Sequence, residues 1–373
     1  MNKAILPKVA KPIRYEVKLD INLSNFEYTG FQDVELEIIE ETQSFEVNAI
    51  DIEIVTASLF NEDGEKLDLA FEYMKDLERI SFSANENITV GKYSLQLEFN
   101  STITNDLKGF YKSQFLDLND NVKWIATTQF EPTSARNAFP CWDEPEYKAV
   151  FSIALTSDEK YLRISNEKVL SENKLKDGRV ETLFVDSMKM STYLVAFVIG
   201  ELEVTEVGSV GDTKIRIIHR PGFSHQTSFA GIAGMKILEF FENYYQIPYP
   251  GSKLDLIAIP DFAMGAMENV GAVTFRESLL LIDESKATRQ ELSRSVSVIA
   301  HELAHMWFGD LVTMKWWDGI WLNEAFASLM ESIAANGTYP EFEQWSEMNL
   351  SRSAGFGVDL SLIHISEPTR LLA

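Results

Sequence analysis

Apolar and polar residues alternate along much of the first half of the chain. The alternation is clear at 15–23 and recurs at 34–38 and 93–99, with short polar turn segments between the runs. A period of two buries one face of a β-strand. Many short strands joined by polar turns predict an antiparallel sandwich or a saddle-shaped sheet, which we assign to an N-terminal β domain over residues 1–220.

The pattern changes to mixed helix and strand near residue 220. Apolar residues over 227–245 follow helical spacing, and 254–259 and 272–282 have the apolar character of strands. We therefore expect an α+β multidomain chain in which a second domain occupies 221–359.

Two further helices are predicted in the second domain. Thr288 and Glu291 have the spacing of a capping box, and Gly309 stands where a left-handed residue would end that helix. The next helix is expected to begin near Asn323 and to end before Gly337.

Charge and composition narrow the classes of partner. The 373 residues hold 33 Lys and Arg against 57 Asp and Glu, a net charge of -24. This excess of acid argues against binding to nucleic acid through its phosphates. No stretch approaches the roughly 20 apolar residues of a membrane span, and the N-terminus has no apolar signal core. Because Cys141 is the only cysteine, we predict a reducing, cytoplasmic compartment.

The segment 301–305 carries the clearest chemistry in the sequence. His301 and His305 are four residues apart, so on a helix both imidazoles face one side and can share a metal ion. Glu302 between them is a candidate general base. With 5 histidines in the chain, a chance match is a rare alternative. Glu324 is the candidate third ligand, although an acid in a first helical turn can simply complement the helix dipole.

Three motifs in the same order resemble the M1 family of zinc aminopeptidases, which are gluzincins. The zinc motif is 298–310, continued by 321–327. The second motif is Gly-Ala-Met-Glu-Asn at 265–269. The third is 128–136, leading into 139–145.

The resemblance implies a fold, a cofactor and a substrate. The fold would be the N-terminal β domain followed by the first part of a thermolysin-like catalytic domain, with one Zn²⁺ per chain bound by His301, His305 and Glu324. The substrates would be peptides with a free N-terminus. Their α-amino group is cationic or nearly so at neutral pH, and Glu268 and Glu131 would anchor it. The implied substrate-binding set is Gln129, Glu131, Gly265, Ala266, Met267, Glu268 and Asn269.

The resemblance also sets expectations for the end of the chain. The tyrosine with which the family stabilises the oxyanion falls past Ala373, so we expect the chain alone to be weakly active or inactive. Residues 360–373 resemble one reading frame of a sequencing-library adapter. We predict that this tail is an artefact, and we exclude His364 as a ligand. A zinc endopeptidase and a non-catalytic metal-binding fragment remain alternatives, and the oligomeric state stays open.

Overall fold

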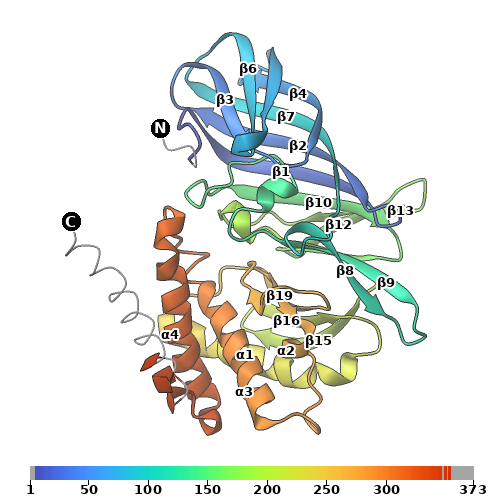
Figure 1. Cartoon of the computed structure of the whole chain (residues 1–373), viewed down its shortest axis with the longest axis vertical. Coiled ribbons are helices and arrows are strands. Elements are labelled where there is room, and N and C mark those ends of the chain that lie inside the picture. The colour runs from blue at the N-terminus through green and yellow to red at the C-terminus, as the bar shows by residue number, and fades with distance from the viewer. Residues whose placement is uncertain (1–4, 347, 351, 354–373) are drawn as a thin grey trace, which may run out of the picture.

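The computed structural model describes residues 5–346, 348–350 and 352–353. The strands within these residues form sheets of ten, four and five strands, and helices cover the last of them (Figure 1). The α+β fold class and its N-terminal, mainly antiparallel β domain are confirmed. The predicted artefactual tail, 360–373, lies outside the described residues.

The ten-stranded sheet forms the upper part of the molecule in Figure 1. Its order is β12-β13-β10-β1-β2-β7-β4-β5-β6-β3, and its neighbours are antiparallel except β1 and β10. The predicted alternation holds, because Tyr15, Val17 and Leu19 of β1 are at most 1% exposed. The strands are β1 (Ala10–Asn22), β2 (Glu27–Ile38), β3 (Thr42–Asn48), β4 (Glu53–Asn61), β5 (Lys66–Met74), β6 (Arg79–Ile88), β7 (Gly91–Thr102), β10 (Val150–Asp158), β12 (Val169–Lys174) and β13 (Arg179–Phe184).

A four-stranded antiparallel sheet packs on this one through aromatic side chains. Phe139 contacts Phe151 of β10 and Phe197 of β14, so one apolar core joins the two sheets. The sheet consists of β8 (Gly109–Leu116), β9 (Val122–Gln129), β11 (Leu162–Ser165) and β14 (Phe197–Gly200).

The five-stranded sheet supports the helices and is mixed in direction. Its order is β15 (Glu203–Val210), β16 (Thr213–His219), β17 (Lys253–Ile259), β19 (Ala272–Arg276) and β18 (Ala266–Met267). β16, β17 and β19 are parallel, whereas β18 lies antiparallel at one edge. Because β15 and β16 precede residue 220 and yet pair into this sheet, we infer that the second unit begins near Glu203.

The helices of the second unit are α1 (Ser228–Tyr245), α2 (Glu277–Leu280), α3 (Arg289–His305) and α4 (Ile320–Thr338). α3 contacts both α1 and α4. A second core lies between these helices and the sheet, with Leu256 and Phe275 from strands and Ile299 and Leu303 from α3. Short 3₁₀ turns occupy Lys75–Leu77, Ala135–Asn137, Thr192–Leu194, Ser224–Gln226, Trp317–Gly319 and Pro340–Phe342.

Several predicted boundaries of these elements differ from the structure. The strand predicted over 272–282 ends at Arg276, where one turn of helix, α2, begins. α3 stops at His305, before Gly309, which adopts a φ of 145°. α4 begins at Ile320, before Asn323, and its last turn includes Gly337. Among the described residues, no helix combines the length and apolarity that crossing a membrane requires.

Candidate active site

The N-terminus of α3 is fixed by the predicted capping box. Thr288 accepts a hydrogen bond from the backbone of Glu291, whose carboxylate accepts from Thr288 in return. Four turns later the helix presents His301 and His305 on one face, next to α4. Local capping and core packing therefore position the motif independently of any ligand.

Three side chains converge between α3 and α4. Donor atoms of His301, His305 and Glu324 all lie within 4.8 Å of one another. The two Nε2 atoms are 3.1 Å apart, and Glu324 Oε2 lies 3.2 Å from His301 Nε2 and 3.7 Å from His305 Nε2. Tetrahedral ligands about 2 Å from a zinc ion are about 3.3 Å apart. The donor set and its spacing therefore fit one such ion.

The other ring nitrogens have partners that orient the imidazoles. His301 Nδ1 lies 3.2 Å from Glu331 Oε2, and His305 Nδ1 lies 3.0 Å from the carbonyl oxygen of Phe308. Such contacts select the tautomer that leaves Nε2 free to bind metal. Glu331 was not predicted as a site residue, although its spacing of seven residues from Glu324 places both on one face of α4.

The electrostatics of the cluster reflect close packing of opposite charges. Hydrogen bonds from His301 and His305 hold the pKa of Glu324 below its usual range. Burial opposes protonation of His301, but hydrogen bonds to Glu324 and Glu331 outweigh it and raise the pKa of His301 to about 9. A metal ion that binds the imidazole nitrogens of His301 and His305 must displace the protons that those nitrogens carry.

Glu302 lies on α3 beside the three candidate ligands. It is 5% exposed. Burial, together with the charge of Glu268, raises the pKa of Glu302 to about 8, against the opposing effect of His301. A carboxylate with a pKa near the working pH suits general base catalysis.

The predicted Gly-Ala-Met-Glu-Asn segment forms the edge of the five-stranded sheet. Ala266 and Met267 pair with β19, and Gly265 accepts a backbone hydrogen bond from Arg276. β18 is the last strand in the sheet order, so its other side has no strand partner among the described residues. A Cβ on Gly265 would meet only Leu279, at 3.7 Å. This edge is therefore the place in the sheet at which an added strand would pair with β18.

Buried acids lie between this edge and the candidate metal ligands. Glu268 is 3% exposed, and its Oε1 has no hydrogen-bond partner, with His305 Nδ1 at 3.9 Å. Glu131 Oε1 is also buried without a partner. Burial, followed by the charge of Glu268, raises the pKa of Glu131 to about 9. Gln129 Nε2 contacts Met267 Sδ at 3.2 Å, which links β9 to β18.

Two other residues complete the surroundings. The Asn269 amide donates to Thr274 Oγ1 at 3.3 Å, so its side chain holds the turn between β18 and β19. Asp310, which was not predicted as a site residue, is 0% exposed, and neither of its carboxylate oxygens has a hydrogen-bond partner. Burial and the charge of Glu268 raise the pKa of Asp310 well above its usual value.

The helix α3 carries the His-Glu-x-x-His segment 301–305, and the neighbouring helix α4 carries Glu324. This arrangement is typical of the His-Glu-x-x-His class of metal-dependent peptidases. Residues 229–361 match the Peptidase family M1 domain, and residues 11–194 match the Peptidase M1 N-terminal domain. The chain belongs to peptidase family M1.

Similar proteins come from distant organisms. The chain is 39% identical to the puromycin-sensitive aminopeptidase of Caenorhabditis elegans, over 95% of this chain and 38% of that protein. It is 39% identical to human endoplasmic reticulum aminopeptidase 2, over 91% of this chain and 36% of the relative. It is 38% identical to aminopeptidase M1-A of Oryza sativa, over 96% of this chain and 41% of that protein. The chain thus spans about two fifths of the length of these relatives.

Proposed function

We propose that this chain carries the metal-binding and amine-binding part of a zinc-dependent aminopeptidase. One observation supports this most strongly. Three metal-donor side chains, His301, His305 and Glu324, converge beside buried carboxylate oxygens of Glu131 and Glu268 that have no hydrogen-bond partner. Buried carboxylate oxygens that lack hydrogen bonds are costly, and a cationic group of the substrate would supply those bonds.

The proposed mechanism assigns each residue one task. A bound zinc ion would polarise the scissile carbonyl and make water more acidic. Glu302 would accept the proton of the attacking water on its carboxylate and then deliver it to the leaving amine. Glu268 and Glu131 would bind the substrate α-amino group, while Gly265 and Ala266 pair with the substrate backbone as an added strand. Anchoring the amine beside the metal site would restrict cleavage to the first peptide bond.

The substrate class and location follow from the same proposal. Peptides with a free N-terminus are the proposed substrates, and the three relatives described above all carry the word aminopeptidase in their names. A cytoplasmic location is retained as a proposal from the single cysteine, although one relative is named for the endoplasmic reticulum.

The test combines metal analysis with turnover. The chain should bind one zinc ion, and any hydrolysis of aminoacyl chromogenic amides should stop when a chelator is added. Glu302→Gln should bind zinc as wild type does but lower turnover by about 10²–10⁴. Exposed Glu284→Gln is the matched control.

The alternatives give different results in the same assay. Cleavage of N-acetylated peptides would favour an endopeptidase, because an amine-anchoring site rejects them. Zinc binding without turnover on either substrate would indicate a non-catalytic fragment. Chelator-insensitive hydrolysis would contradict the proposal.

A further inference from the structure

Tyr193 links the N-terminal β domain to both segments that carry the candidate metal ligands. It lies in the 3₁₀ turn Thr192–Leu194 and is 1% exposed. Its hydroxyl donates to the carbonyl oxygen of Gly309 at 3.1 Å and accepts from Asn323 Nδ2 at 3.4 Å. Gly309 follows α3, and Asn323 immediately precedes Glu324 on α4. One hydroxyl therefore contacts both the loop that follows α3 and the first turn of α4.

The loop that Tyr193 contacts also orients His305. His305 Nδ1 lies 3.0 Å from the carbonyl oxygen of Phe308, the residue before Gly309. Gly309 has a φ of 145°, and a Cβ there would lie 3.1 Å from His305 Nδ1 and 3.5 Å from Asn323 Nδ2. A side chain at position 309 would therefore crowd the imidazole of His305. A shift of this loop would move the hydrogen-bond acceptor of His305.

The same loop is held to the N-terminal domain at a second point. Lys148 Nζ donates to the carbonyl oxygens of Asp310 and Leu311, at 2.9 Å and 3.2 Å. Within the loop, the backbone of Gly309 donates to Val312 at 2.8 Å, and Thr313 Oγ1 also donates to Gly309. These bonds make the loop a stiff connection between the β domain and the histidine ring.

We infer that Tyr193 is a positioning residue for the metal site, which it acts on through Gly309 and Asn323. Its hydroxyl sets the distance between the segment that orients His305 and the segment that carries Glu324. This inference rests on the proposed function, because it requires that the three side chains bind a metal ion. Its consequence is that the β domain contributes to metal affinity as well as to folding.

Removing only the hydroxyl tests this role. Tyr193→Phe keeps the ring that packs edge-on against Trp317, with centroids 5.5 Å apart. The matched control is Tyr28→Phe, because Tyr28 is 2% exposed and its hydroxyl also donates to a carbonyl oxygen, that of Ala138. Zinc affinity of the 373-residue chain is measured by competition with a chromophoric chelator, and thermal unfolding is measured without metal.

Tyr193→Phe should weaken zinc binding about tenfold, the lower end of the effect of losing an outer partner of a metal ligand. It should also alter the visible absorption of the Co²⁺-loaded chain. Tyr28→Phe should leave both unchanged at a similar thermal midpoint. Asn323→Ala removes the other partner of the hydroxyl and should also weaken zinc binding. It serves as the test if Tyr193→Phe does not fold.

The outcomes separate this inference from the proposed function. Zinc binding by Tyr193→Phe that equals wild type would overturn the positioning role and leave the metal site intact. Equal weakening by Tyr28→Phe would also overturn it, because any buried hydroxyl would then suffice. A wild-type chain that binds no zinc would instead overturn the proposed function.

Discussion

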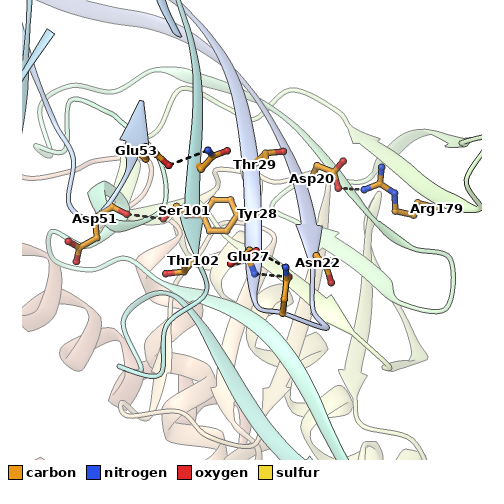
Figure 2. Close-up of a pocket in the computed structure, with 12 residues that line it drawn as sticks. Asp20, Asn22, Glu27, Tyr28, Thr29, Asp51, Glu53, Ser101, Thr102 and Arg179 are labelled. Carbon is orange, nitrogen blue, oxygen red and sulfur yellow. Dashed lines mark hydrogen bonds and ion pairs between the residues drawn. The ribbon is translucent and has the colours of Figure 1, made fainter. Parts of the chain in front are cut away.

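Two polar regions of the molecule differ in how their side chains are satisfied. A cavity of about 690 Å³ lies against the ten-stranded sheet, lined by acids and amides (Figure 2). Asp20 pairs with Arg179, Glu53 accepts from Asn100 at 3.3 Å, and the Tyr28 hydroxyl donates to a backbone carbonyl. The residues that line this cavity all belong to the described part of the chain. None of them has a buried polar side-chain atom without a hydrogen-bond partner.

The candidate active site has the opposite character. Glu131, Glu268 and Gln129 each contribute a buried side-chain oxygen without a hydrogen-bond partner. The nearby donor atoms of the metal cluster are arranged to share one ion. Buried oxygens without hydrogen bonds and raised carboxyl pKa values, rather than volume, thus distinguish the candidate active site from this cavity.

The largest predicted effect comes from removing one buried acid whose Oε1 has no hydrogen-bond partner. Glu268→Gln should weaken binding of a peptide with a free N-terminus by about 2–5 kcal/mol, because the buried ammonium group would lose its carboxylate partner. Binding is measured by calorimetry on the zinc-loaded chain. The same peptide with an acetylated N-terminus should bind wild type and variant equally.

Exposed Glu284→Gln controls for the loss of one negative charge. If it weakened binding as much as Glu268→Gln does, the effect would come from net charge. Buried carboxylate oxygens without hydrogen-bond partners would then not explain why one region binds the peptide and the other does not.

A smaller effect is expected for the outer partner of a metal ligand. Glu331→Gln replaces the carboxylate that lies 3.2 Å from His301 Nδ1, and it should weaken zinc binding about 10–100-fold. The chelator-competition assay measures this change. Glu341→Gln, at an exposed position after α4, should leave zinc affinity unchanged. Unchanged affinity in Glu331→Gln would show that the imidazole is oriented by packing alone.

Local sequence rules predicted the framework of this site well. The Thr288 capping box and the alternation in β1 depend on neighbouring residues, and both are confirmed. The same rules failed at Glu277–Leu280, where a strand turns directly into one turn of helix. They also could not show that β16 pairs with β17, because that pairing depends on segments far apart in the chain.

The site shows the same division between local and distant information. The spacing of His301 and His305 predicts their convergence, and the structure places Glu324 beside them. Tyr193 and Gly309 are 116 residues apart, so no periodicity indicates their hydrogen bond. Residues that orient the ligands are thus harder to predict than the ligands themselves.

The raised pKa of Glu131 predicts how stability changes with pH. Burial and the charge of Glu268 raise the pKa of Glu131 from 4.5 to about 9 in the folded chain. The unfolded chain releases this proton first, so the free energy of unfolding should fall as pH rises through that range. Glu131→Gln should flatten the decline.

Urea unfolding in the presence of a chelator, repeated across this pH range, measures the decline. Exposed Glu284→Gln should follow the wild-type curve. Parallel curves for wild type and Glu131→Gln would show that Glu131 is ionised in the folded chain, as an ordinary surface acid is.

The smallest effect is predicted for the satisfied cavity of Figure 2. Glu53→Gln preserves the size of a side chain whose carboxylate accepts one bond, from Asn100 at the surface. It should change the free energy of unfolding by no more than about 0.5 kcal/mol, measured by urea denaturation, and leave zinc and peptide binding unchanged. A loss of peptide binding in this variant would mean that a cavity with every buried polar atom partnered can still bind substrate. Unmet hydrogen bonding would then no longer separate the two regions, and the case for Glu131 and Glu268 as the amine anchors would rest on family resemblance alone.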